Sequence, residues 1–342
     1  MPADPLEIAA GDVLGAYRLP SPCQCIPLGS AGGFSGARLW RVLILGQILR
    51  LKAWPADFQD SERLGRVHRW MGMACLHGLN FVPVVQRARD ERSWQVRAAR
   101  FWDLTEWMSG TADFRLQPSL ERVQAACQAL ASLHHVWQRE SLIETPPSVI
   151  RRMQSVREWD ALLRSGWRPE FSPEELDPVT AVARRIWLLL PPFLPEIRLR
   201  LECWTDKRRL QPCICDIWHD HVLFSGANVS GIIDYGSMRI DHPATDLARM
   251  LGSLIGDHQS MFAVGIAAYR QVRPFDDVEA TLARVLDWTG MVLGAANWLH
   301  RLYREKRYYE DRTLVAKRMQ ALFDRMEYFA SSPSLAKSFR CL

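Results

Sequence analysis

Short apolar runs alternate with turn signals in the first part of the chain, and helical spacing takes over in the second. Residues 12–52 carry such runs and are expected to form strands. Two of these runs, 39–45 and 48–51, flank the turn signal Gly46-Gln47. This pattern predicts a β-hairpin near the start of the chain.

One helix and a second hairpin are expected before residue 100. The helix begins at the capping pair Asp60-Ser61 and ends near Gly78, because the apolar side chains between them recur at helical spacing. Residues 81–85 and 94–99 are separated by a charged turn and predict the hairpin. The first hundred residues are therefore expected to be mostly antiparallel sheet with one helix.

The remainder of the chain has mainly helical periodicity. Ser119 is placed to cap a helix, and residues 146–200 are helical segments interrupted by prolines. Two short strands are expected at 212–215 and 229–233, followed by nearly continuous helix over 245–329. These elements predict an α+β, two-lobed fold. The N-terminal lobe is expected at 1–106 and the mainly helical C-terminal lobe at 107–342, with a helical insertion at 146–200.

Composition narrows the class of protein. With 342 residues, 24% of them charged and 48% hydrophobic, the chain is long enough for two cores and too apolar to be disordered. The net charge of +5 is spread along the chain and does not indicate a nucleic-acid partner. No signal peptide or membrane-length apolar stretch is present, so a cytoplasmic protein without membrane contact is expected, with its eight cysteines as free thiols.

The strongest chemical pattern lies between residues 213 and 236. An apolar strand leads into Asp216, His221 follows five residues later, and a second strand leads into Asp234 of an Asp-Tyr-Gly turn. In kinases the first Asp accepts the proton of the attacking hydroxyl, and the two later positions hold metal ions against the phosphates. The spacing therefore predicts a phosphoryl-transfer site.

Further parts of such a site lie upstream in the correct order. A glycine-rich turn spans 28–36, where backbone NH groups could approach phosphate, and a strand then places two cations on one face. Glu62, in the first turn of the following helix, is the candidate to orient one of these cations. The candidate nucleotide-binding residues are Gly32, Gly33, Gly36, Arg50, Lys52 and Glu62.

These motifs resemble those of the aminoglycoside phosphotransferase family, also called the phosphotransferase enzyme family, within the protein-kinase-like fold. The similarity lies at 214–217, 221–224, 232–236 and 246–248. It implies Asp216 as catalytic base, with Asp234 and His221 as ligands of Mg²⁺ or Mn²⁺. It also implies ATP as phosphate donor, Arg50 or Lys52 with Glu62 as the phosphate-binding ion pair, and a small molecule with a hydroxyl group as acceptor.

Three departures from the family pattern involve four positions. Ile214-Cys215 replaces His-Gly, Trp218 replaces a small, polar or His residue, and His221 replaces Asn. Imidazole is a softer ligand than the amide oxygen of Asn and suits Mn²⁺ or Zn²⁺ better than Mg²⁺. An alternative function is therefore a nucleotide-binding pseudokinase with a regulatory or scaffolding role.

Two further interpretations concern neighbouring residues. The run His219-Asp220-His221, with Asp241-His242 downstream, is compatible with a zinc hydrolase, although the kinase-like order explains more of the chain. Asp246 is expected to cap the helix that follows it, and the alternative is that its carboxylate holds the catalytic loop by hydrogen bonds.

Overall fold

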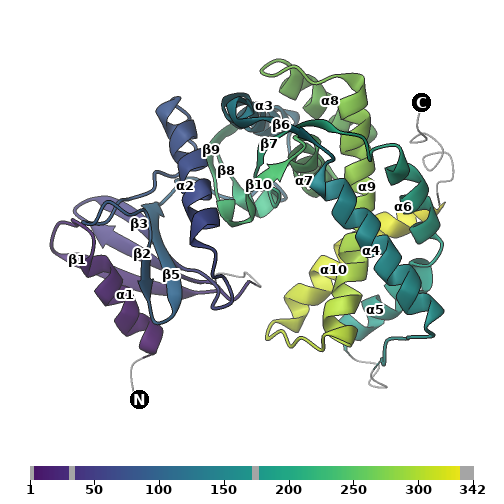
Figure 1. Ribbon diagram of the computed structural model, residues 1–342, viewed down its shortest axis with the longest axis horizontal. Coiled ribbons are helices and arrows are strands. Elements are labelled where there is room, and N and C mark those ends of the chain that lie inside the picture. The colour runs from purple at the N-terminus through teal and green to yellow at the C-terminus, as the bar shows by residue number, and fades with distance from the viewer. Residues whose placement is uncertain (1–3, 31–34, 172–176, 332–342) are drawn as a thin grey trace. The chain divides into compact units, whose positions relative to one another are not determined.

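The structure, a computed structural model, describes residues 4–30, 35–171 and 177–331 (Figure 1). The chain separates into two compact units, and each unit is built from two stretches of the chain. The first unit comprises Met1–Trp137 and His219–Met238, and the second comprises Gln138–Trp218 and Arg239–Leu342. We describe each unit by itself.

A five-stranded antiparallel sheet forms the centre of the first unit, with the strand order β1-β2-β3-β5-β4. Its strands are β1 (Cys23–Gly29), β2 (Arg38–Ile44), β3 (Gln47–Ala53), β4 (Gln95–Arg97) and β5 (Arg100–Glu106). The predicted hairpin near the start of the chain is confirmed as β2 and β3, which are joined at Leu45-Gly46.

The second predicted hairpin is wrong. Residues 81–85 form no strand, and Val85 makes only an isolated bridge to Thr105. The partner of β4 is instead β5, reached through a tight turn in which Ala98 and Ala99 have φ values of +47° and +55°. Such a turn usually contains Asn or Gly, so two alanines at this place gave no indication of a turn in the sequence.

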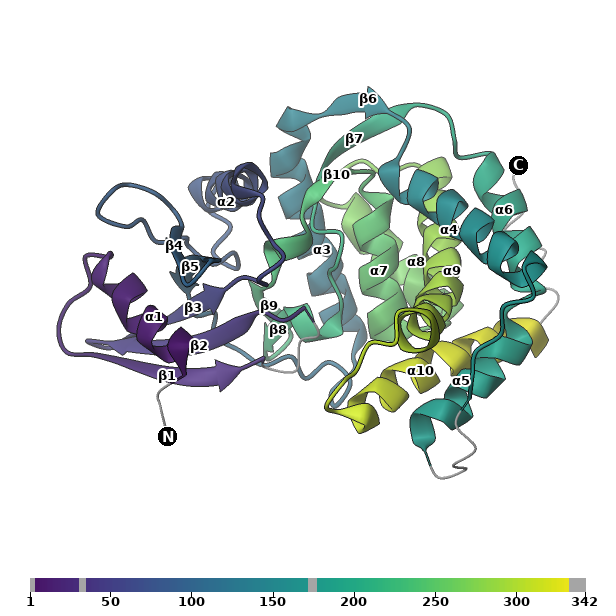
Figure 2. The ribbon, with the colours of Figure 1, turned by 60° about the horizontal axis from the view of Figure 1, so that its bottom comes forward.

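Helices α1 (Pro5–Gly15), α2 (Ser61–Leu76) and α3 (Leu120–Trp137) belong to the same unit. The predicted helix after Asp60 is confirmed as α2, since the Asp60 side chain accepts a hydrogen bond from the Arg63 backbone NH. Helix α1 was not expected, although Asp4 caps it and Pro5 occupies its first turn. Within the described part of the first hundred residues there are thus two helices, α1 and α2, which lie on different sides of the sheet (Figure 2).

The two faces of the sheet have different chemistry. Alternate β3 side chains Leu49, Leu51 and Ala53 join the core under α1. Arg50 and Lys52 therefore point to the opposite face, as strand geometry requires. This second face carries the charged residues of the candidate site.

A separate hairpin completes the first unit. It is formed by β8 (Val222–Ser225) and β9 (Asn228–Ile232), preceded by the 3-10 turn His219–His221 and followed by the 3-10 turn Tyr235–Ser237. The Ile232 backbone NH donates to the Phe81 carbonyl at 2.8 Å. This bond ties the hairpin to the segment that follows α2.

The second unit is mainly helical, as predicted. A three-stranded sheet consists of β6 (Leu142–Glu144), β7 (Arg208–Cys213) and β10 (Arg239–Asp241) in the order β10-β7-β6. The helices are α4 (Pro147–Arg164), α5 (Pro178–Leu189), α6 (Phe193–Glu202), α7 (Ala244–Ile255), α8 (Gln259–Arg270), α9 (Asp277–Leu299) and α10 (Arg312–Ser331), with a π-helical turn at His300–Arg304. Helix α9 packs against α4, α5, α6, α7 and α10 and is the centre of this unit.

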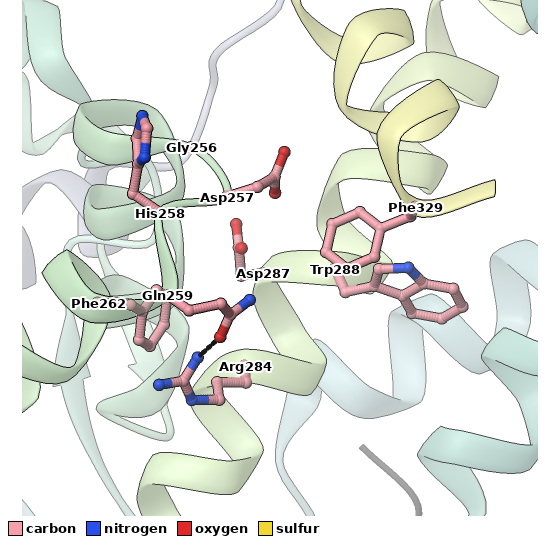
Figure 3. Close-up of a pocket in the computed structure, with 9 residues that line it drawn as sticks. All are labelled: Gly256, Asp257, His258, Gln259, Phe262, Arg284, Asp287, Trp288 and Phe329. Carbon is pink, nitrogen blue, oxygen red and sulfur yellow. Dashed lines mark hydrogen bonds between the residues drawn. The ribbon is translucent and has the colours of Figure 1, made fainter. Parts of the chain in front are cut away.

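A small cavity lies beside α9, and Asp257, Arg284 and Asp287 are among the residues that line it (Figure 3). Its volume is about 10 Å³, which is room for one water molecule. Arg325 of α10 forms ion pairs with Asp257 at 2.7 Å and with Asp287 at 2.8 Å. The pair with Asp287 fixes α10 to α9, and the pair with Asp257 fixes α10 to the segment between α7 and α8. The cavity is too small to receive a substrate.

The cysteines only partly match the expectation of free thiols. Those at positions 23, 25, 75, 127, 213 and 215 are free. Cys203 is disulfide-bonded, so the expectation is wrong at this position, and Cys341 lies outside the described residues.

Among the helices of the described ranges, none combines the length and the apolar character needed to cross a membrane.

Candidate active site

An ion pair between Lys52 and Asp234 forms the centre of the charged face in the first unit. Lys52 Nζ lies 3.2 Å from Asp234 Oδ1, and the Trp54 ring lies against the same ammonium group, 4.4 Å from ring centroid to Nζ. Strand β3 supplies Lys52, and the turn after β9 supplies Asp234. The structure thus pairs Asp234 with Lys52 rather than with the other candidate cation, Arg50.

The turn at Asp234 has an unusual backbone. Asp234 has φ +61° and ψ +66°, which is the left-handed region, and its Oδ1 accepts a hydrogen bond from Gly236 N at 3.4 Å. A Cβ on Gly236 would lie within 3.4 Å of Asp234, Trp54 and Lys52, so a larger residue would crowd the pair. The Lys52 charge is the main cause that holds the pKa of Asp234 well below its usual range, with His221 and Arg50 contributing. Asp234 is therefore a carboxylate at neutral pH.

His221 lies on the other side of the same carboxylate. Its Nε2 is 3.8 Å from Asp234 Oδ2, while Oδ1 faces Lys52. The β8–β9 hairpin fixes this position, because the Ile233 backbone NH donates to the His221 carbonyl at 2.9 Å. Two ligands bound to one divalent ion at about 2.1 Å each can lie up to about 4.2 Å apart, so the pair fits a shared metal ion.

Arg50 belongs to a neighbouring network around Asp103. Asp103 is buried and lies 3.5 Å from Arg50 Nη2, 2.5 Å from Trp54 Nε1 and 3.5 Å from His68 Nε2. Because Trp54 also lies against Lys52, this network supports the strand that carries Lys52. Asp103 was not among the sequence candidates, although its alternation with Trp102 and Leu104 placed it on the charged face.

The Asp103 network predicts a specific acid sensitivity. Burial raises the pKa of Asp103, but the hydrogen bond from His68 and the charges of Arg50, His68 and Lys52 outweigh it and lower the pKa from 3.8 to about 2. A lowered folded-state pKa stabilises the protein above the unfolded-state value, and this contribution is lost as the pH falls through about 2. We expect the free energy of unfolding to fall by about 2 kcal/mol more in the wild type than in Asp103→Asn between pH 5 and pH 2.

Urea unfolding at each pH measures this difference, with Asp57→Asn, an exposed aspartate of the same unit, as the matched control. Equal pH slopes for the wild type and Asp103→Asn would show that the network does not lower this pKa.

Glu62 lies away from the Lys52–Asp234 pair. Its side chain is 89% exposed and lies 3.9 Å from Arg66, one helical turn further on. The next residue, Arg63, points toward the site and donates to the Gly236 carbonyl at 2.9 Å. Helical spacing indicated that Arg63, and not Glu62, lies on the buried face of this helix. Glu62 shares a face with Arg66 and Arg69, whereas Arg63 lies one turn before the buried Val67 and two turns before the buried Trp70.

The glycine-rich turn is only partly described. Gly32 and Gly33 lie outside the described residues. Gly36 is exposed with φ +80°, and its carbonyl accepts a hydrogen bond from Arg100 Nη1 at 3.0 Å. The left-handed backbone at Gly36 agrees with a position that favours glycine.

Asp216 belongs to the second unit and follows strand β7. Its Oδ1 lies 3.3 Å from Arg249 Nη2 of α7, and both side chains are about half exposed, at 47% and 48%. The residue before it, Cys215, has φ +66°. This is the position at which the similar family carries Gly, and the left-handed backbone explains that preference.

Asp246 holds the backbone in front of Asp216. Its two carboxylate oxygens accept hydrogen bonds from Ile214 N and Cys215 N, both at 2.6 Å, and the side chain is fully buried. It lies inside the first turn of α7, which begins after Pro243. The expectation that Asp246 caps this helix is therefore wrong, and the alternative, that it holds the loop, is confirmed.

The strained Cys215 backbone leads to a stability prediction. We expect Cys215→Gly to be more stable than Cys215→Ala by about 1 kcal/mol, because both lack the thiol and only Ala retains the left-handed penalty. The control is Ala263→Gly, at an exposed position within α8, where Gly should be less stable than Ala by about 1 kcal/mol. Urea unfolding measures both differences, and an equal stability of the two Cys215 variants would contradict the prediction.

The second unit also bears on the zinc hydrolase interpretation. Asp241 is buried and accepts hydrogen bonds from Ser148, Arg151 and the His242 backbone NH. His242 Nδ1 accepts from Ala244 N at 3.2 Å. These two residues therefore hold the local fold, which argues against their use as zinc ligands.

Several solved structures share this architecture across nearly the whole chain. A spectinomycin phosphotransferase in complex with ADP and spectinomycin has a TM-score of 0.66 at 11% identity and covers 96% of this chain and 98% of its own. A microcompartment-associated aminopropanol kinase has a TM-score of 0.60 at 16% identity, with the same two coverages. An amicoumacin kinase in complex with AMP-PNP, Ca²⁺ and Ami has a TM-score of 0.60 at 13% identity and covers 94% of each chain.

The fold is thus that of the protein-kinase-like phosphotransferases, and the predicted fold class is confirmed. A family model described as the phosphotransferase enzyme family matches residues 31–285. This match spans most of the chain, and the protein belongs to that family. No curated protein matches the chain.

Proposed function

We propose that the protein is an ATP-dependent phosphotransferase that moves the γ-phosphate to a hydroxyl group of a small molecule. The observation that carries the proposal is the Asp234 carboxylate, with one oxygen 3.2 Å from Lys52 and the other 3.8 Å from His221. A cation that can bind the phosphates, beside a carboxylate that can share a metal ion with a second ligand, is the arrangement that phosphoryl transfer requires.

Each residue of the proposed site has one task. Asp216 orients the acceptor hydroxyl and accepts its proton. Lys52 binds the phosphates and Arg50 adds positive charge, while Asp234 and His221 would hold Mg²⁺ or Mn²⁺, which neutralises charge on the phosphates when it is bound. Positioning and charge neutralisation provide most of the catalysis in such sites.

The nucleotide and the metal have support from similar structures. The spectinomycin phosphotransferase holds ADP, and the amicoumacin kinase holds AMP-PNP with Ca²⁺. Glu62 is left out of the proposed site because its side chain is exposed beside Arg66. Gly36 remains a candidate for phosphate contact through its backbone.

A nucleotide-binding pseudokinase is the second candidate function. The observation that favours it is His221, which stands in the place of the family's Asn, 3.8 Å from Asp234. An imidazole there could weaken Mg²⁺ binding while leaving nucleotide binding in place.

Transfer from γ-labelled ATP to a panel of small hydroxylated molecules, with Mg²⁺ and with Mn²⁺, tests the proposal. We expect transfer to at least one acceptor, and a preference for Mn²⁺ would agree with the imidazole ligand. Thermal stabilisation by ATP without transfer or hydrolysis under any condition would refute the enzyme and support the pseudokinase. Stabilisation by Zn²⁺ but not by ATP would instead support the hydrolase.

A further inference from the structure

The surroundings of Asp216 in the second unit are rich in arginine. Arg249 lies 3.3 Å from the Asp216 carboxylate, yet its side chain remains 48% exposed. A guanidinium presents five NH donors in a planar fork, so one carboxylate does not use all of them. Arg249 can therefore contact Asp216 and still offer donors to a second group.

Trp218 brings a second guanidinium to the same place. The Arg318 guanidinium of α10 lies 4.7 Å from the Trp218 ring centroid, and that of Arg249 lies 6.0 Å from it. The indole thus holds two cationic side chains within cation–π range, two residues after Asp216. This gives a physical reason for a Trp at a position where the family carries a small, polar or His residue.

Three more arginines add to the positive charge of the region. Arg151 and Arg239 share the single carboxylate of Asp241, at 2.9 and 3.8 Å. Burial lowers the pKa of Arg152 to about 10, and the charges of Arg151, Arg239 and Arg249 contribute to this shift. Arg152 is therefore close enough to each of the other three guanidiniums to be repelled by it.

The nearby carboxylates are already engaged by the protein. Asp241 serves two arginines and Asp216 faces Arg249. Asp246 accepts hydrogen bonds from two backbone NH groups. A region with this charge attracts anions and repels cations.

We propose that the acceptor of this phosphotransferase carries a carboxylate or phosphate group close to the hydroxyl, and that Arg249 and Arg318 bind this oxyanion. The inference rests on the proposed function, since it assigns the acceptor class of the same site. An oxyanion on Arg249 would place a hydroxyl a few bonds away beside the Asp216 carboxylate. Arg249 would then bind the substrate and also orient the base.

A matched series of three-carbon diols tests the acceptor class. Glycerol is neutral, 3-amino-1,2-propanediol is cationic, glycerate carries a carboxylate and glycerol 3-phosphate carries a phosphate. We expect a higher kcat/KM for one or both anions than for glycerol, and the lowest for the amine. The better of the two anions identifies which oxyanion the site recognises. A higher kcat/KM for glycerol or the amine than for both anions would overturn the inference and leave the phosphotransferase function intact.

Arg249→Gln and Arg318→Gln test the residues, with Arg157→Gln, an exposed arginine of α4, as the matched control. Loss of a charge-assisted hydrogen bond should lower kcat/KM for the anionic acceptor by about 10- to 100-fold. For glycerol the fall in kcat/KM should be at least about 10-fold smaller than for the anionic acceptor, because glycerol has no charge for the arginines to bind. Any disturbance of Asp216 by Arg249→Gln would lower both values equally, so the ratio isolates recognition of charge. The ratio in question is kcat/KM for the anionic acceptor divided by kcat/KM for glycerol. If this ratio is the same in both variants as in the wild type, the assignment of these arginines is overturned.

If no diol is phosphorylated, calorimetry can still measure whether glycerate and glycerol 3-phosphate bind. Binding to the wild type that Arg249→Gln loses and Arg157→Gln retains would support the oxyanion site even if the phosphotransferase function fails. Absence of binding, or equal binding to the wild type and Arg249→Gln, would overturn it.

Discussion

Asp216→Asn is expected to lower kcat about 10³-fold while the protein still binds ATP, because the amide cannot accept the proton of the acceptor hydroxyl. Asn has nearly the same shape and keeps a polar partner for Arg249, which lies 3.3 Å from Asp216. The loss should therefore fall on kcat rather than on stability. Steady-state transfer of labelled phosphate measures kcat, and the thermal shift with ATP reports binding.

The matched control for this prediction is Asp206→Asn, which removes an exposed carboxylate from the same unit. It should leave kcat within about 2-fold of the wild type, because no described contact links Asp206 to the loop. If Asp216→Asn retains kcat within the same range, Asp216 is not the base, and another group must accept the proton.

Asp246→Ala should lower the free energy of unfolding by about 3 kcal/mol, because it leaves two backbone NH groups in the interior without their acceptor. Both hydrogen bonds measure 2.6 Å, and the side chain has no exposed surface. Asp246→Asn retains one acceptor oxygen, so it should lower the free energy of unfolding by less, about 1 to 2 kcal/mol. Urea unfolding measures both variants.

Asp277→Ala provides the comparison, since Asp277 also lies in the first turn of a helix but is 93% exposed. An exposed charge there contributes less than about 1 kcal/mol. If Asp246→Ala lowers the free energy of unfolding by no more than Asp277→Ala does, the Asp246 carboxylate acts through the helix dipole and does not hold the loop.

The fold could be predicted where local signals agreed with the tertiary structure. The hairpin at Gly46 and the helix after Asp60 follow from turn and capping residues, and Ser119 Oγ accepts from the Arg122 NH as expected of a cap. Helix α1 was missed although Asp4-Pro5 is a start signal, because the chain after it was interpreted as strand. Strand β5 was missed because its turn consists of two alanines, which carry no turn signal of their own.

The site could be predicted as a set of residues but not as a set of contacts. Spacing identified Lys52, His221 and Asp234, and the structure brings these three together. The choice between Arg50 and Lys52 depends on partners far along the chain, which spacing cannot supply. The role of Asp246 could not be predicted for the same reason, since its donors lie more than thirty residues earlier.

The discontinuous first unit has a consequence for synthesis on the ribosome. Its second stretch, His219–Met238, follows Gln138–Trp218 of the other unit, so 81 residues separate the two parts of one core. At about 5 to 20 residues per second, the first stretch of the unit is complete roughly 4 to 16 s before the second stretch begins to emerge. During this interval Lys52, which is buried in the folded unit, has no Asp234 to pair with, and Phe81 lacks its hydrogen bond from Ile232. The charged face of the nascent sheet therefore lacks its partner residues during this interval. This is when chaperones would be most useful to the protein.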